Sequence, residues 1–142
     1  MVYSELTKKA MNIAYDNHHG QYDKGGVPYI FHSIHLAEQM DTEEECIVAL
    51  LHDVVEDTDV TFEDLENEFS KEVMDALRLL THDKDEDYME YVKRIKTNEI
   101  ARKVKMADLM HNYDKTRVGS DLIKKEKTKG GLYKEAYEYL SK

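Results

Sequence analysis

A histidine and three carboxylates stand at the end of an apolar run, and all four are types that bind metals. The run extends from Cys46 to Val55, contains His52 and Asp53 side by side, and is followed at once by Glu56 and Asp57. A helix of this composition is apolar almost all round and is therefore buried. Charge inside a protein is costly unless it is paired or coordinates a metal. We therefore interpret the run as part of a metal site.

The expected geometry of a helix supports this interpretation. Residues four apart share a helix face, so His52 would lie over Glu56, and Asp53 over Asp57. One helix edge would then carry a nitrogen ligand and three carboxylates. The alternative is a buried pair of His52 and Asp53 that only hydrogen-bonds, followed by a solvated helix end.

Two further candidates lie far from this run in the sequence. Asp108 follows Ile100 and Val104 at intervals of four, so it faces the same way as two apolar residues and should point inward. His32 stands where a glycine-rich loop ends and a helix should begin. Taken separately, Asp108 could be a buried aspartate paired with a lysine or a backbone group, and His32 a capping histidine. His35 could be a ligand, a partner of a ligand, or simply buried.

Together these side chains offer two nitrogen and two oxygen ligands to one ion: His32, His52, Asp53 and Asp108. Such a set suits Mn²⁺, Fe²⁺ or Zn²⁺ better than Ca²⁺ or Mg²⁺, which prefer oxygen alone. A metal lowers the pKa of a bound water from 15.7 toward about 7. Glu56 and Asp57 would lie beside that water and could accept or return a proton. The predicted chemistry is metal-assisted hydrolysis of a phosphate ester or anhydride.

Length and charge narrow the class of protein. The 142 residues, 41% hydrophobic and 35% charged, suit one globular domain spanning 1–142. A net charge of −10 speaks against nucleic-acid or anionic-membrane partners but leaves a small phosphorylated substrate possible. The N-terminus lacks a signal-peptide pattern and no apolar run approaches the ~20 residues of a membrane span. We expect a cytoplasmic protein.

The spacing of apolar residues predicts an all-α fold of about seven or eight helices in a single compact domain. One proline and six glycines imply helices joined by short turns, and no segment alternates convincingly enough for a strand. The expected helices begin after Ser4, near His32, at Thr42, at Thr61, after Ser70, near Tyr88, at Asn98 and near Ser120. The third of these would run through His52 and Asp53.

Other charged residues have ordinary surface interpretations. Residues 82–87 should form an acidic surface loop. Four histidines are expected at the surface: His18, His19, His82 and His111. Six basic residues are expected to be largely solvated, although they could line a phosphate entrance: Lys93, Arg94, Lys96, Arg102, Lys103 and Lys105.

The order of the four candidate ligands resembles the HD superfamily of metal-dependent phosphohydrolases. The extended motifs are similar, more narrowly, to the hydrolase domain of the RelA/SpoT alarmone enzymes. They lie at residues 20–21, 26–32, 50–58 and 105–112, and the resemblance covers nearly the whole chain. It implies a compact all-α fold of the HD-domain type and an Mn²⁺-dependent removal of pyrophosphate from the 3′ position of ppGpp or pppGpp. Because this chain stops at Lys142, we expect a stand-alone form without a synthetase domain.

The resemblance also implies roles for individual residues. It assigns the metal to His32, His52, Asp53 and Asp108. It assigns the nucleophilic water to Glu56 and Asp57. It assigns substrate contacts to Lys24, Asn112, Lys129 and Tyr133.

Three positions depart from the family pattern. Asp23 replaces an arginine that packs on the guanine base, Val27 replaces an acidic residue, and Ser33 replaces a proline. A carboxylate at position 23 removes a stacking cation and repels phosphate. One alternative is therefore an HD phosphohydrolase acting on another nucleotide. A second is a metal-binding helical module without turnover, which would have no need of Glu56 and Asp57.

Overall fold

The structure, a computed structural model, describes residues 1–114, 116 and 127–142, without the side chains of 127–131. The all-α prediction is confirmed: apart from an isolated bridge between Tyr22 and Pro28, the regular elements of the described residues are helices. Their bounds are α1 Glu5–His18, α2 Ile30–Glu38, α3 Glu43–Leu51, α4 Val54–Asp57, α5 Phe62–Glu66, α6 Lys71–Leu80, α7 Tyr88–Ile95, α8 Glu99–Asn112 and α10 Lys127–Ser141. None of these helices combines the length and apolarity that crossing a bilayer demands.

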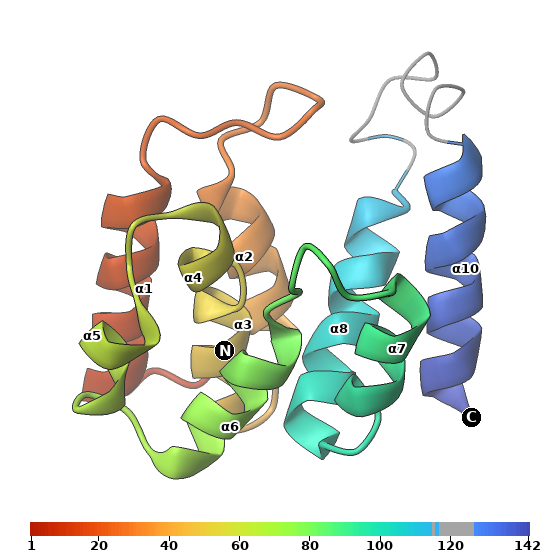
Figure 1. Cartoon of the computed structure of the whole chain (residues 1–142). Coiled ribbons are helices and arrows are strands. Elements are labelled where there is room, and N and C mark those ends of the chain that lie inside the picture. The colour runs from red at the N-terminus through yellow and green to blue at the C-terminus, as the bar shows by residue number, and fades with distance from the viewer. Residues whose placement is uncertain (115, 117–126) are drawn as a thin grey trace.

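Helix α3 is the centre of the fold. Every residue from Cys46 to Leu51 is buried, and α3 packs against α1, α2, α6 and α8 (Figure 1). Helices α7 and α10 lie on the far side of α8 from α3 in the same view. A helix that is apolar on all faces is stable only when it is enclosed in this way.

Side-chain caps start the helices where the sequence predicts them. The Thr42 hydroxyl accepts from the Glu45 amide at 3.2 Å, and the Glu45 carboxylate accepts from the Thr42 amide at 3.1 Å. Ser4, Thr61, Ser70 and Asn98 also cap their helices. These caps satisfy amide groups that have no partner within the helix. The predicted start near Ser120 lies outside the described residues.

The prediction of one helix through His52 and Asp53 is wrong. Helix α3 ends at Leu51, and α4 begins at Val54 after Asp53 has adopted φ −106° and ψ 0°. Neighbours on a regular helix diverge by about 100° because a turn takes 3.6 residues. The break allows two consecutive side chains to face each other, with His52 Nε2 2.8 Å from Asp53 Oδ2.

Candidate metal centre

The structure brings four predicted side chains from three parts of the chain to one point. His32 comes from α2, His52 and Asp53 from the break after α3, and Asp108 from α8. One ligand atom from each lies within 4.8 Å of all the others. His32 Nε2 is 2.8 Å from Asp108 Oδ1, and His52 Nε2 is 3.5 Å from the same oxygen. The cluster is buried, with Asp53 alone partly exposed.

The hydrogen bonds of His52 show that a cation fits this cluster. Its Nδ1 lies 2.7 Å from the Ala49 carbonyl oxygen, an acceptor, so Nδ1 carries the proton. Its Nε2 is buried, makes no hydrogen bond within the described residues, and faces carboxylate oxygens of Asp53 and Asp108. A lone pair facing two carboxylates is repelled unless a proton or a metal lies between. Histidine ligands of metals commonly donate their other N–H to a backbone carbonyl in this manner.

Without a metal, the negative charges of Asp53 and Asp108 are compensated by a proton on His52 and by the ammonium group of Lys105. Burial alone would lower the pKa of His52, but the charges of Asp53 and Asp108 raise that pKa well above its usual value. Burial opposes ionisation of Asp108, yet Lys105 and the two histidines hold the pKa of Asp108 well below its usual value. The centre therefore attracts positive charge strongly.

Lys105 belongs to the site, although the sequence suggested a largely solvated position for it. Its side chain is only 12% exposed, and its Nζ lies 3.0 Å from Asp108 Oδ2. The rings of Tyr88 and Tyr91 cover it, with centroids 5.8 and 5.3 Å from Nζ. The spacing of three residues to Asp108 on one helix was the available clue. The sequence left open whether Asp108 pairs with a lysine or joins the metal cluster. In the structure it does both, because one oxygen contacts Lys105 and the other lies beside His32 and His52.

Tyr29 was also missed. Its hydroxyl donates a hydrogen bond to Asp53 Oδ2, and burial together with the negative charge of Asp53 raises the pKa of Tyr29. The tyrosine therefore remains a neutral donor and fixes the orientation of the carboxylate. Its position within the motif at residues 26–32 was the only clue in the sequence.

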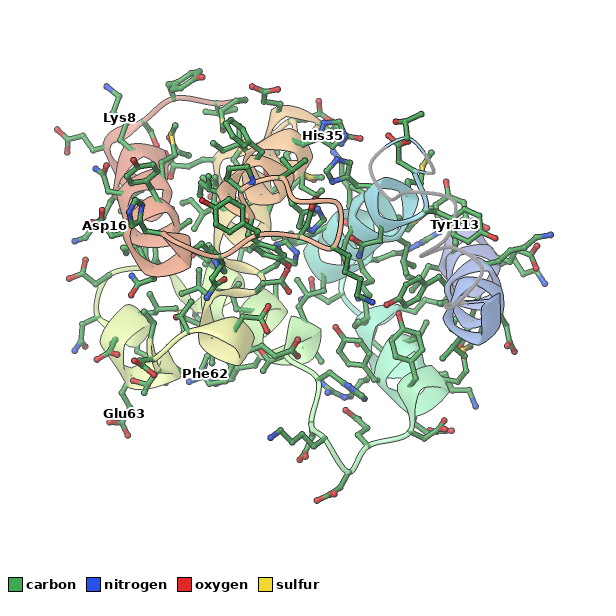
Figure 2. All side chains as sticks on the ribbon, turned by 90° about the horizontal axis from the view of Figure 1, so that it is seen from above. Lys8, Asp16, His35, Phe62, Glu63 and Tyr113 are labelled. Atoms are coloured by element: carbon green, nitrogen blue, oxygen red, sulfur yellow. The ribbon has the colours of Figure 1, made fainter. Side chains whose placement is uncertain are left out.

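Two histidines expected at the surface belong to the surroundings of the centre instead. His111 Nδ1 lies 2.7 Å from His32 Nδ1, and the two rings stack with centroids 4.9 Å apart. His18 is 1% exposed and packs on Tyr29 with ring centroids 5.0 Å apart. His35, considered as a ligand, a partner of a ligand or a buried residue, is exposed on the side of α2 toward α8 (Figure 2) and lies outside the four-residue cluster. Its ring stacks on that of His111, with centroids 4.0 Å apart.

The two predicted proton carriers lie at the outer side of the centre. Oxygens of Asp53, Glu56 and Asp57 lie within 4.8 Å of one another, and the last two residues are exposed. Partial burial and neighbouring negative charge raise the pKa of Glu56 and of Asp57. Glu56 Oε1 accepts a hydrogen bond from the His82 amide at 2.8 Å. A carboxylate beside the metal cluster and open to solvent can exchange protons with a reacting group.

The predicted substrate-contacting residues are placed less uniformly. Asn112 Nδ2 donates to Asp108 Oδ1 at 3.1 Å, so this residue lies next to the centre. Tyr133 is half-buried and borders a cavity of about 250 Å³ between α8 and α10. Lys24 is exposed on the loop before α2. The side chain of Lys129 lies outside the described residues.

The three residues that depart from the family pattern, Asp23, Val27 and Ser33, lie in the loop before α2 and in α2 itself. Asp23 Oδ1 accepts from the amides of Gly25 and Val27, each at 2.9 Å, so this carboxylate shapes its own loop. Asp23 and Val27 also border a cavity of about 430 Å³ next to His32. Ser33 is fully buried, and its hydroxyl has no hydrogen-bond partner among the described residues.

A family model for the HD domain matches residues 10–108, which include all four clustered side chains. The chain belongs to the HD domain family. Membership implies a divalent metal, and the buried His and Asp cluster fits one.

Individual relatives of this HD domain confirm the resemblance to the RelA/SpoT hydrolases. The guanosine-3′,5′-bis(diphosphate) 3′-pyrophosphohydrolase of Borreliella burgdorferi is 35% identical over 121 residues, which are 73% of this chain and 18% of that protein. The corresponding MESH1 enzyme of Danio rerio is 34% identical over 117 residues, 73% of this chain and 65% of that protein. The chain thus spans less than two thirds of the length of these relatives.

A solved structure extends the likeness over nearly the whole chain. It is described as a metazoan ortholog of SpoT that hydrolyzes ppGpp and plays a role in starvation responses. The TM-score is 0.79 with 25% sequence identity, and the match covers 99% of this chain and 87% of that one.

For the HD domain of this chain we predict that Lys105→Met destabilises the metal-free protein by about 3–5 kcal/mol. The substitution leaves the buried carboxylate of Asp108 without its lysine partner. Urea unfolding measures the change, and saturating Mn²⁺ should reduce it because the metal replaces the lost positive charge. The matched control is Lys103→Met on the same helix. The Lys103 side chain is 37% exposed and solvent screens its ion pairs with Asp41 and Glu45, so its loss should destabilise the protein clearly less. Equal losses for the two variants would contradict the placement of Lys105.

We also predict that Tyr29→Phe weakens metal binding by about 10- to 100-fold. Loss of the hydroxyl frees the Asp53 carboxylate from its fixed orientation, and such supporting contacts contribute that much to metal affinity. Mn²⁺ titration measures the effect. Tyr22→Phe, in the same loop and 65% exposed, is the control. An unchanged affinity in Tyr29→Phe would show that the tyrosine does not orient a ligand.

Proposed function

We propose that this HD domain is a metal-dependent phosphohydrolase that releases pyrophosphate from the 3′ position of ppGpp or pppGpp, leaving GDP or GTP. The observation that carries this proposal is the cluster of His32, His52, Asp53 and Asp108 with Glu56 and Asp57 at its open side. Relatives at 33–35% identity over most of the chain bear the name of this activity, which supports the choice of substrate.

The cofactor we propose is Mn²⁺, with Fe²⁺ or Zn²⁺ as alternatives, because two imidazoles and two carboxylates form a mixed nitrogen and oxygen set. A divalent metal held by this set would act as a Lewis acid and lower the pKa of a water toward about 7. Lys105 and Tyr29 keep Asp108 and Asp53 ionised and oriented for that purpose.

Proton transfer is the proposed role of the two outer carboxylates. Glu56 takes the proton from the attacking water, and Asp57 beside it orients that water and shares the proton. Water attacks the phosphorus atom that is bonded to the 3′ oxygen of the ribose, and the bond between that phosphorus and the 3′ oxygen breaks. The proton passes to the 3′ oxygen, so the products are pyrophosphate and a nucleotide with a free 3′-hydroxyl. Such general acid–base help typically contributes 10²–10⁴-fold to a rate.

Substrate contacts are proposed on the rim of the centre. Asn112 is next to Asp108 and is proposed to contact the substrate near the metal. Lys24 and Lys129 would supply positive charge toward a polyphosphate in a protein whose net charge is −10. Tyr133, which borders the cavity between α8 and α10, would contact the nucleoside.

One observation favours a second candidate, an HD phosphohydrolase acting on a different nucleotide. Asp23 is committed to the amides of Gly25 and Val27 and takes the place of a base-stacking arginine. A guanine base would lack that stacking contact and would face a carboxylate instead.

The deciding experiment is to add Mn²⁺ to the protein and follow products from a nucleotide panel. The panel holds ppGpp, pppGpp, their adenine analogues, GTP and GDP. The proposal predicts Mn²⁺-dependent formation of pyrophosphate and GDP from ppGpp. Faster turnover of another nucleotide would favour the second candidate. Metal binding with no turnover of any substrate would indicate a binding module.

A further inference from the structure

The loop between α6 and α7 contacts Glu56, the proposed proton carrier, which lies 26 positions before His82 in the sequence. The backbone amide of His82 donates to Glu56 Oε1 at 2.8 Å, and no other hydrogen bond to this carboxylate is seen among the described residues. Glu56 is exposed and stands on α4, a helix of only four residues. A glutamate in this setting has several accessible rotamers, so the amide of His82 selects one of them.

Arg94 on α7 holds that loop from both ends. Its guanidinium donates in a forked pair to Glu86, with Nε to Oε2 at 2.7 Å and Nη2 to Oε1 at 2.6 Å. It also donates to the carbonyl oxygens of Leu79 and Thr81, each at 3.3 Å. We call these four contacts the Arg94 clamp. A planar fork fixes the position of its partners more strictly than a lysine could.

Contacts within the loop transmit this constraint to the His82 amide. The His82 ring nitrogen Nε2 lies 2.8 Å from the Glu86 carbonyl oxygen, and the Tyr91 hydroxyl donates to the Leu80 carbonyl at 2.6 Å. Residues on both sides of the His82 amide are thus fixed. The acidic loop is exposed at residues 83–85, as the sequence suggested, and it also contacts Glu56 through the His82 amide.

We propose that Arg94 is a positioning residue that holds the His82 amide against Glu56 and so keeps the Glu56 carboxylate directed at the reacting water. This inference rests on the proposed function, in which Glu56 accepts a proton. Misplacing a catalytic group by about 1 Å can cost on the order of 100-fold in rate, so a loosened carboxylate should lower turnover measurably.

The experiment compares Arg94→Met and Glu86→Gln, which break the clamp from its two sides, with Arg78→Met. Arg78 is the matched control because its guanidinium pairs with Glu66 and lies over the ring of Phe62, both on α5, and its side chain is 42% exposed. All assays are run well below the unfolding temperature of each variant. We expect kcat to fall about 10-fold in both clamp variants, with KM and manganese content unchanged. Arg78→Met should retain the kcat of the unmodified protein.

A double-mutant cycle separates positioning of Glu56 from a purely structural role. In a Glu56→Gln background an amide replaces the carboxylate and cannot accept the proton, so the placement of this side chain ceases to matter. Arg94→Met should then change kcat by less than about twofold, because two residues that act as a unit are non-additive. An equal loss in both backgrounds, or no loss in either clamp variant, would overturn the inference.

Amide hydrogen exchange gives a readout that does not depend on any substrate. The His82 amide should be protected in the unmodified protein and in Arg78→Met, and should exchange at least 10-fold faster in Arg94→Met and in Glu56→Ala. Unchanged protection in Arg94→Met would refute the clamp even if ppGpp is hydrolysed. If no nucleotide is hydrolysed, the proposed function fails, while the exchange rates still decide whether Arg94 holds the loop.

Discussion

Asp53→Ala will lose the metal and the activity together. Asp53 Oδ2 lies 2.8 Å from His52 Nε2, accepts from Tyr29, and belongs to both the four-residue cluster and the outer carboxylate group. Without this ligand the remaining three cannot hold the ion in the same place, and turnover should fall by at least about 1,000-fold because water activation depends on the metal. Metal content after gel filtration and Mn²⁺-dependent pyrophosphate release are measured on the same preparation.

The metal-free form of the same variant should stay folded. Asp53 and Asp108 repel each other across the cluster, so removing one carboxylate relieves that repulsion while it removes the Tyr29 hydrogen bond. Circular dichroism checks that the helices are intact, and Asp59→Ala, an exposed aspartate after α4, is the control. A folded Asp53→Ala protein that still retains the metal or still turns over would refute the assignment of this centre.

Glu56→Ala will lose turnover but, unlike Asp53→Ala, will retain the metal. Glu56 stands outside the four-residue cluster, and its carboxylate is exposed beside Asp53. Removal of a general base typically costs 10²–10⁴-fold, and we expect a loss of about that size in kcat. Metal titration and steady-state kinetics on the same sample separate the two properties.

The matched control for Glu56→Ala is Glu63→Ala. Glu63 is an exposed glutamate of α5 that points outward from the molecule (Figure 2), so its loss should leave both metal binding and kcat unchanged. Loss of metal from Glu56→Ala would make Glu56 a ligand rather than a proton carrier. Retained turnover would transfer the proton step to Asp57.

The cluster was predictable because its polar and charged residues occur where the neighbouring residues are apolar. His52 and Asp53 interrupt an apolar run, and Asp108 continues an apolar helix face, so burial followed from periodicity and the need for a cation followed from burial. The capping boxes at Thr42 and Thr61 were predictable for a similarly local reason, since the two partners are three residues apart.

The residues that were missed depend on contacts between distant segments. Lys105 is largely shielded from solvent because Tyr88 and Tyr91 from α7 cover it. His111 lies inside the site because α2 brings His32 against it. Periodicity gives the direction of a side chain on its own helix but not the element that packs over it.

The break between α3 and α4 could not be predicted from helix propensity either. No glycine or proline marks the boundary, and the residues on both sides are apolar. The requirement that His52 and Asp53 face one point overrides the regular helix, which is a tertiary effect. Local rules fail at this position because it belongs to the site.

The central claim is that His32, His52, Asp53 and Asp108 hold one divalent ion. A crystal structure of the Mn²⁺-loaded protein, with anomalous scattering recorded at the manganese edge, tests it most directly. We predict one strong anomalous peak bonded to His32 Nε2, His52 Nε2 and a carboxylate oxygen from each of Asp53 and Asp108. A peak located elsewhere, or one that leaves Asp108 or His32 uncoordinated, would contradict it.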